Sequence, residues 1–318
     1  MLLGRAEEFS RISALLDGAL EGRSGALVAR GDAGLGKSAL LDVAASAAGF
    51  RVLRARGLEA ESEIGYAGLH SLLIPIIDAR SELPPLQSDV IAAALSLGPP
   101  RPDERLAIYA GTLGLLAAAS RREPILAIID DAHLLDRASA EAIGFVARRL
   151  RDDRVAMLLA VREGEPSALD TGGIPELMLQ PLDDIAAEAL LGRRRKPVTR
   201  TSRAHILALA RGNPLAILEL PTIAEGHAGV PTALDALSPG GVLTRVFGRR
   251  IGRLPRPTRM ALAIAAASDG DDLRIVLSAC RFLSIPSSAF VAAEEARIVE
   301  IASDSIKFRH PLVRAAVY

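Results

Sequence analysis

A glycine-rich loop between two apolar segments constrains this chain more than any other feature of its sequence. The stretch reads GALVARGDAGLGKSALLDVAASAA over residues 25–48. Glycine in such a loop costs conformational entropy, so its use indicates special backbone geometry or the close approach of a ligand. Gly31, Gly34, Gly36, Lys37 and Ser38 match the pattern G-x-x-x-x-G-K-[ST], whose backbone N–H groups cradle phosphate oxygens. The loop therefore predicts a phosphate-binding P-loop.

The segments on either side of the loop fit this interpretation. Residues 26–30 form an apolar run typical of a buried strand, and apolar residues at helical spacing follow over 38–48. The amino end of that helix would add free N–H groups and a positive dipole to the site. Lys37 is predicted to reach the β- and γ-phosphates and Ser38 to bind Mg²⁺, with Ala39 beside them in the nucleotide-binding set. A chance match in a glycine-rich turn is the alternative, and the flanking patterns argue against it.

A second motif, acidic, lies in PILAIIDDAHLLD over residues 124–136. An apolar strand ends in Asp130 and Asp131, at the carboxyl edge of a sheet, where open α/β folds bind ligands. This is a Walker B pattern: Asp130 is predicted to hold Mg²⁺, and Asp131 to orient or deprotonate the attacking water. Many strands end in acidic turns, but the P-loop upstream favours the functional interpretation.

An arginine ends a further apolar strand in the segment LLAVREG, residues 158–164. Arg162 could contact the γ-phosphate through paired hydrogen bonds. It could equally be a strand-terminal arginine that faces solvent, and the sequence alone does not separate these two hypotheses.

Strand-like and helical patterns alternate over the first half of the chain. Strands are expected at 26–30, 51–56, 125–129 and 155–161, and helices at 5–20, 38–48, 104–120 and 138–150. The alternation predicts an α/β P-loop NTPase domain over 1–180, a parallel sheet with helices on both faces. Short helical patterns predict a helical domain over 181–241. Over 242–318, helices followed by a small hairpin (298–301 and 306–308) predict a winged-helix domain.

Composition excludes several other classes of protein. The 318 residues carry 38 basic and 38 acidic side chains, so the whole chain lacks the cationic character of a nucleic-acid binder. Two basic clusters, 193–203 and 249–259, contain no aromatic residues, which favours solvated surface over contact with DNA. The single cysteine, Cys280, excludes an internal disulfide and is expected to be buried. A secretory signal and a bilayer-length apolar run are both missing, so we expect a cytoplasmic protein without a membrane partner.

Two further residues have local explanations that need no ligand. In ARGNPLA, Gly212 ends one helix, Asn213 caps the next and Pro214 takes its first position. In FRHPLVR, His310 lies in a turn before a helix that begins at Pro311.

Several segments, taken in order, resemble the N-terminal ATPase region of the large ATP-binding regulators of the LuxR family. They are LLGRAEEF, GDAGLGKSALL, GLEAESEIGYAGLHSLL, IIDDAHLLDRASAEAIGFVARRL, ARGNPLAILELP and FRHPLVRAAVY. These regulators belong to the STAND class of signal-transducing P-loop NTPases, relatives of AAA+ proteins. The resemblance spans essentially the whole chain. It implies a nucleotide-binding, a helical and a winged-helix domain with ADP clamped between them.

The resemblance also implies roles for particular residues. Arg5, in LLGRAEEF, looks like the arginine that lies beside the adenine and nucleotide pocket. Arg162 matches the sensor arginine, and Pro214 matches a proline that packs on adenine. His310 corresponds to a winged-helix histidine that can bind the β-phosphate of ADP. The expected cofactors are therefore ATP or ADP and Mg²⁺.

The family pattern continues beyond what this sequence contains. Full regulators carry a helical-repeat sensor region and a C-terminal helix-turn-helix, so we interpret the chain as an excised fragment or a truncated relative and expect it to bind DNA only weakly. The function implied is a nucleotide-operated switch with slow Mg²⁺-dependent ATP hydrolysis, which leaves homo-oligomerisation open. The alternatives are an AAA+-type DNA remodeller and a stand-alone P-loop ATP hydrolase or kinase.

Overall fold

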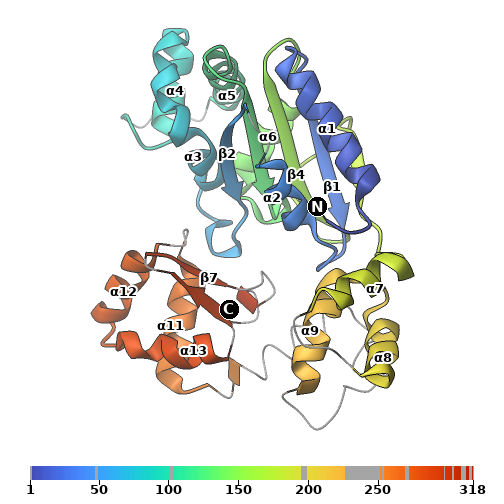
Figure 1. The fold of residues 1–318 in the computed structure, drawn as a ribbon. Helices are drawn as coiled ribbons and strands as arrows, with labels where there is room; N and C mark the ends of the chain where they lie inside the picture. The colour runs from blue at the N-terminus through green and yellow to red at the C-terminus, as the bar shows by residue number, and fades with distance from the viewer. Residues whose placement is uncertain are drawn as a thin grey trace. The chain divides into compact units, whose positions relative to one another are not determined.

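The computed structural model forms two compact units, Met1–Arg193 (unit 1) and Arg194–Tyr318 (unit 2) (Figure 1). It describes residues 2–46, 49–99, 104–194, 199–225, 251–252, 254–268, 272–296, 298–302, 304–308, 313–314 and 317.

Unit 1 alternates strands and helices as expected. Its elements are α1 (Ala6–Leu20), β1 (Gly25–Gly31), α2 (Lys37–Ala44), β2 (Arg51–Arg56), η1 (Glu59–Glu61), α3 (Ala67–Leu73), η2 (Ile74–Glu82), α4 (Pro85–Ala94), α5 (Arg105–Ser120), β3 (Ile125–Asp130), η3 (Ala132–Leu134), α6 (Arg137–Ala147), β4 (Val155–Arg162), β5 (Glu176–Met178) and α7 (Asp184–Gly192).

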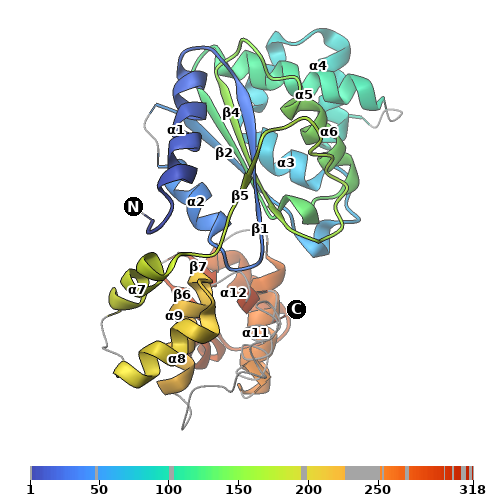
Figure 2. The ribbon, with the colours of Figure 1, turned by 90° about the vertical axis from the view of Figure 1, so that its right-hand side faces the viewer.

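A five-stranded sheet in the order β2-β3-β4-β1-β5 forms the centre of unit 1. Every pair of neighbouring strands in it is parallel. Helices α1 and α2 cover one face, and α3, α5 and α6 cover the other (Figure 2). The prediction of a parallel sheet with helices on both faces is confirmed.

Strand β4 shows why this part of the fold can be predicted from the sequence. Its residues 155–161 are all buried. Val155 and Met157 enter the core beneath α3, α5 and α6, whereas Ala156 and Leu158 enter the core beneath α1 and α2. Because successive side chains of a strand point to opposite faces, a strand covered on both sides needs an apolar residue at every position.

The structure departs from the expected elements in three places. The predicted helix over 38–48 ends at Ala44, where Ser46 N donates to Val43 O (3.1 Å) and tightens the last turn. The segment between residues 57 and 103, for which no element was expected, contains η1, α3, η2 and α4. The edge strand β5 was missed, because three residues are too few to show a period.

Unit 2 contains helices and a small antiparallel sheet. Its described elements are α8 (Arg200–Ala210), α9 (Pro214–Glu225), α11 (Arg256–Ala267), α12 (Leu273–Phe282), η5 (Ser287–Phe290), α13 (Val291–Glu295), β6 (Val299–Ile301) and β7 (Ile306–Phe308).

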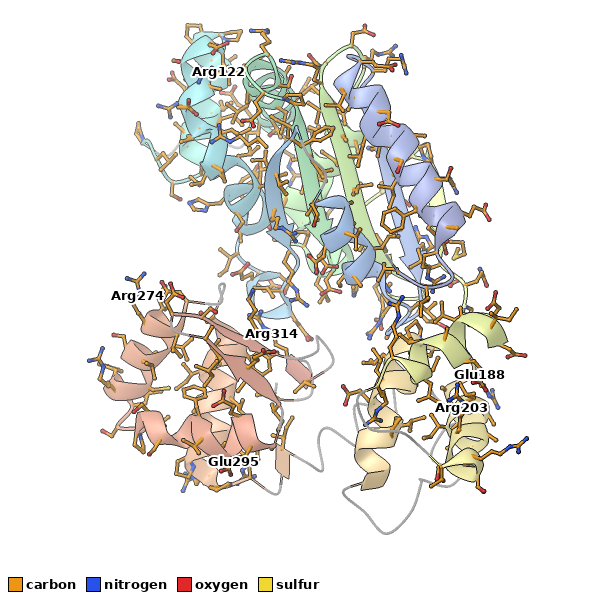
Figure 3. All side chains as sticks on the ribbon, in the orientation of Figure 1. Arg122, Glu188, Arg203, Arg274, Glu295 and Arg314 are labelled. Carbon is orange, nitrogen blue, oxygen red and sulfur yellow. The ribbon has the colours of Figure 1, made fainter. Side chains whose placement is uncertain are left out.

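Three predicted local features of unit 2 are confirmed: the hairpin, the buried cysteine and the Asn213 cap. The helix predicted to end at Gly212 ends at Ala210, with Arg211 as its cap. Strands β6 and β7 pair antiparallel as a hairpin. Cys280 is a buried free thiol. The carboxamide oxygen of Asn213 accepts from Leu215 N (3.1 Å) and Ala216 N (3.2 Å) and caps α9. Arg314 donates to Ala266 O (2.8 Å) and Ser268 O and so binds the end of α11 (Figure 3).

Across the described part of the chain, no single helix combines the length and apolar character needed to cross a bilayer. One strongly bent pair, Leu273–Phe282 with Ser287–Glu295, has sufficient length and composition when taken together.

Candidate nucleotide-binding site

The P-loop runs from the end of β1 to the start of α2, at the carboxyl edge of the sheet. Gly34 and Gly36 have φ values of 81° and 93°, in the left-handed region that side chains disfavour. A Cβ added at Gly36 would meet nothing within 4 Å, so the backbone conformation, and not packing, requires glycine there. At Gly31, in contrast, a Cβ would lie 3.0 Å from Leu179 O. The loop therefore has the open, backbone-lined form that phosphate binding needs.

Lys37 begins α2 and lies almost completely inside the loop. Its side chain is 9% exposed, and its Nζ donates to Gly31 O (2.6 Å) and Asp32 O (2.8 Å). Burial lowers the pKa of the Lys37 ammonium, and the negative charge of nearby Asp131 opposes that shift. The P-loop backbone thus holds the ammonium close to the Walker B carboxylates.

Arg5 connects the start of the chain to the P-loop. It is 5% exposed, and its guanidinium donates to Glu8 Oε1 (2.8 Å) and to Leu35 O in the loop (3.0 Å). Gly4, before it, has a φ of 64°, and a Cβ there would lie 2.8 Å from Ala186 Cβ on α7. The structure therefore brings Arg5 to the loop, while its role beside adenine stays a prediction.

Ser38 and Asp130 lie together at the ends of α2 and β3. The Ser38 side chain lies close enough to the Asp130 carboxylate to lower its pKa. Burial raises the pKa of Asp130, the charge of Asp131 raises it further, and Ser38 opposes both effects. A hydroxyl and a carboxylate oxygen side by side are hard oxygen ligands of the kind that Mg²⁺ prefers, so these residues fit that ion.

Asp131 is paired with an arginine that sequence reasoning missed. Arg56, at the end of β2, donates to Asp131 Oδ2 through Nε (3.1 Å) and Nη2 (2.8 Å). Asp131 has a φ of 46°, so its backbone is held in a strained conformation. The position of Arg56 could have indicated this pair, because β2 lies beside β3 and Arg56 is in register with Asp130.

Arg162 ends β4 in register with Gly31, the first residue of the P-loop motif. Its Nη1 lies 3.2 Å from Glu165 Oε1, and its side chain is 32% exposed. The positive charge of Arg162 contributes to the lowered pKa of Lys37, which places the two cations near each other. The position suits either hypothesis made for this arginine.

His133, in the turn after the Walker B strand, was also missed by the sequence analysis. The side chain is 9% exposed, and its Nδ1 is buried without a hydrogen-bond partner among the described residues. Burial lowers the pKa of the imidazole, so the neutral ring is favoured.

Three other predicted site residues are placed differently. Ala39 is an exposed residue in the first turn of α2. Pro214 begins α9 in unit 2, as its local sequence predicted. His310 lies outside the described residues, as do parts of the basic clusters 193–203 and 249–259.

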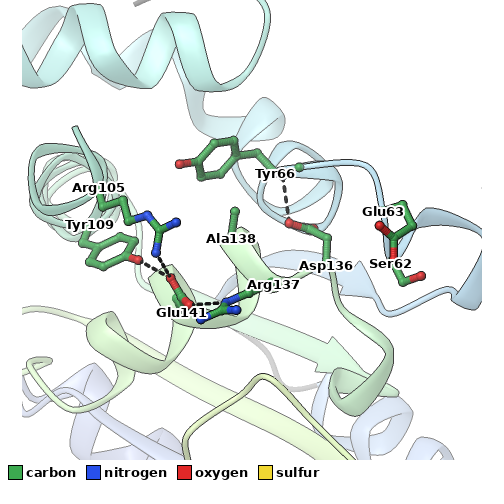
Figure 4. A pocket seen from close by; sticks show the side chains of 10 residues that line it. Ser62, Glu63, Tyr66, Arg105, Tyr109, Asp136, Arg137, Ala138 and Glu141 are labelled. Atoms are coloured by element: carbon green, nitrogen blue, oxygen red, sulfur yellow. Dashed lines mark hydrogen bonds and ion pairs between the residues drawn. The ribbon is translucent and has the colours of Figure 1, made fainter. Parts of the chain in front are cut away.

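A separate pocket of about 230 Å³ is lined by residues from the loop before α3 and from α5 and α6 (Figure 4). Around it, Arg105, Tyr109 and Arg137 all bond the Glu141 carboxylate. At its floor Asp136, only 3% exposed, accepts from the backbone N–H groups of Tyr66 (2.8 Å), Gly68 (3.1 Å) and Ser139 (2.9 Å). The carboxylates of Glu141 and Asp136 are already bonded to their neighbours, so we assign these contacts a structural role.

Replacing Asp136 by alanine should lower the free energy of unfolding of the chain by at least about 2 kcal/mol. The loss leaves buried N–H groups without an acceptor and removes the cap of α6. Urea unfolding followed by circular dichroism measures the effect. Asp42→Ala is the control, because Asp42 forms only an exposed ion pair with Arg54 and such pairs contribute little. Equal stabilities of the two variants would contradict the structural role of Asp136.

Comparisons with known proteins agree with this architecture. The chain resembles a Signal Transduction ATPase with Numerous Domains (STAND) protein with a tetratricopeptide repeat sensor from Pyrococcus horikoshii, with a TM-score of 0.55 and 18% identity. The match covers 96% of this chain and 41% of that one, so the chain spans less than half the length of the STAND protein. At this identity the likeness is one of fold.

Two weaker structural matches are a Walker-type ATPase of Pyrococcus abyssi and Drosophila ORC bound to DNA, both with TM-scores of 0.45. The first is 15% identical and covers 100% of this chain and 98% of that one. The second is 16% identical and covers 100% and 87%. No curated protein matches the chain.

A family model fits the part of the chain that contains both phosphate-site motifs. The AAA ATPase domain model matches residues 1–159, half of the 318 residues, from the Arg5 segment through the P-loop and Walker B strand into β4. The chain belongs to the AAA ATPase domain family.

Proposed function

We propose that this chain binds ATP and ADP with Mg²⁺ and hydrolyses ATP slowly. The observation that carries the proposal is the meeting of Lys37, Ser38, Asp130 and Asp131 at one edge of the sheet. The charges of both aspartates act on the Lys37 ammonium, and Ser38 lies close enough to Asp130 to lower the pKa of that carboxyl. A buried cation, an open backbone loop and paired carboxylates are the parts that phosphoryl transfer to water requires.

Each residue of the candidate site has a separate role in the proposed reaction. The P-loop backbone binds the phosphate oxygens, and Lys37 exchanges its carbonyl partners for the β- and γ-phosphates. Ser38 and Asp130 would hold Mg²⁺, which would supply positive charge that neutralises the phosphates. Asp131 orients the attacking water or takes its proton, while Arg56, bonded at Oδ2, fixes the direction of the carboxylate.

The finer proposal is a nucleotide-operated switch of the STAND class within a LuxR-family regulator. It is supported by the sequence resemblance over the whole chain and by the STAND-like fold. In this proposal residues 1–180 bind nucleotide, 181–241 form a helical domain and 242–318 a winged-helix domain. Arg162 contacts the γ-phosphate, Pro214 packs on adenine, and His310 binds the β-phosphate of ADP. A switch of this kind has two domain arrangements in equilibrium. ATP and ADP can shift that equilibrium only if each binds the two arrangements with different affinities.

The nucleotide held by the purified protein tests the proposal. We expect denaturation of the protein to release ADP. We also expect added Mg·ATP to be hydrolysed far more slowly than about 1 s⁻¹, the low end of turnover rates for ordinary enzymes. Rapid turnover dependent on a phosphate acceptor would favour the kinase alternative instead. DNA-stimulated hydrolysis would favour the DNA-remodelling alternative. Failure to bind either nucleotide, measured by calorimetry, would contradict the whole proposal.

A further inference from the structure

The imidazole of His133 is the one polar side chain beside the candidate site, within the described residues of unit 1, that is both buried and incompletely bonded. Its Nδ1 is buried and has no hydrogen-bond partner in the part of the chain that the structure describes. Leaving a buried polar nitrogen unbonded is costly, so a residue kept in this state needs a physical explanation. The catalytic roles assigned above do not use it.

The local fold holds His133 firmly in place. It lies in the middle of η3, where Leu134 N donates to Asp131 O (2.9 Å), and η3 packs against β4. Gly57 lies so close beneath this turn that a Cβ would come within 2.9 Å of the Leu134 backbone. These contacts fix the position of the His133 backbone beside β4.

The charged groups that act on the pKa of His133 are those of the phosphate site. They are Asp131 from its own turn, Arg162 and Glu165 from the end of β4 and the loop after it, and Lys37 from α2. Burial has the largest effect on the imidazole and lowers its pKa, Asp131 and Glu165 raise it, and Arg162 and Lys37 lower it. His133 is therefore grouped with the lysine and the arginine that are predicted to bind the β- and γ-phosphates.

We propose that His133 binds the terminal phosphate of ATP by donating a hydrogen bond from Nδ1, and so makes the site discriminate ATP from ADP. The proposal rests on the proposed function of the chain. A neutral imidazole carries one N–H, and placing it on Nδ1 gives that buried nitrogen an anionic acceptor. ADP lacks the γ-phosphate, so the bond forms only with the triphosphate.

The test compares two affinities in the full chain. Calorimetry measures the binding of Mg·ADP and of a non-hydrolysable Mg·ATP analogue to the wild type and to His133→Ala. We expect the analogue to bind about tenfold to a hundredfold more weakly to the variant, because a hydrogen bond to a charged group is lost. ADP affinity should stay within about twofold, and the rate of ATP hydrolysis at saturation should fall.

Further variants separate binding from folding. His133→Asn places an amide N–H near the position of Nδ1 and should restore much of the affinity ratio. His133→Leu fills the same space without a hydrogen bond, so it should behave as His133→Ala does, and it serves in its place if the alanine variant does not fold. His70→Ala, an exposed histidine on α3, is the matched control and should change neither affinity.

The possible results separate the role of His133 from the proposed nucleotide binding and hydrolysis. An unchanged ratio of analogue to ADP affinity in His133→Ala and His133→Leu, or equal losses for both nucleotides, would overturn the role of His133 and leave the ATPase proposal intact. If the wild-type protein binds neither nucleotide, the proposed function fails first. A selective loss of analogue binding supports the inference.

Discussion

Replacing Asp131 by asparagine should slow ATP hydrolysis by about a hundredfold or more while nucleotide affinity stays within about twofold. In the proposed mechanism the carboxylate of Asp131 acts on the attacking water, so its loss should affect the transition state more than the bound ground state. Asparagine has nearly the same shape and can still accept a hydrogen bond from Arg56 through its amide oxygen. The turn that carries the residue, with a φ of 46°, also suits asparagine.

Single-turnover hydrolysis and calorimetry together measure this split between chemistry and binding. Asp42→Asn is the control, because Asp42 lies on α2 with an exposed side chain paired to Arg54. A wild-type rate in Asp131→Asn would mean that another group positions the water. A parallel loss of nucleotide affinity would mean that Asp131 acts through the fold or the metal ion instead.

Replacing Lys37 by alanine should weaken the binding of both Mg·ATP and Mg·ADP by about 2–3 kcal/mol, or about thirtyfold to 150-fold. The ammonium is the buried cation of the P-loop, held by Gly31 O and Asp32 O, and it is positioned to exchange these carbonyls for phosphate oxygens. Its pKa is lowered by burial, which shows that the site imposes a cost on the charged form. A bound phosphate group would add negative charge that offsets this cost further.

A stability measurement distinguishes a binding defect of Lys37→Ala from unfolding of the variant. Lys37→Ala relieves the cost of burying a cation but removes the donor to Gly31 O and Asp32 O. These effects oppose each other, so we expect only a small change in the free energy of unfolding, which urea denaturation can check. Lys307→Ala on β7 is the control, since Lys307 is exposed and far along the chain in unit 2. Unchanged nucleotide affinity in Lys37→Ala would contradict the P-loop assignment.

The sequence by itself determined the parts of the site that lie within single continuous segments. The P-loop is recognisable because glycines at Gly34 and Gly36 are needed for a left-handed backbone, a requirement that is local. The strands β1, β3 and β4 are recognisable because a strand covered on both faces must be apolar throughout. Together they predicted a parallel sheet with the loop and the acidic pair at one edge.

Only the tertiary structure decided which side chains from distant segments meet at that edge. Arg56 bonds Asp131 across 75 positions, Asp136 accepts from Tyr66 N across 70, and Arg5 reaches Leu35 O across 30. These partners leave no periodic signal, because one polar residue at a strand end or in a turn looks the same whether it faces solvent or a buried carboxylate. Burial decides between those outcomes, and burial depends on the strand order and on the helices packed above it. The burial of the His133 Nδ1 could not be predicted for the same reason, because it depends on the segments that pack around the turn.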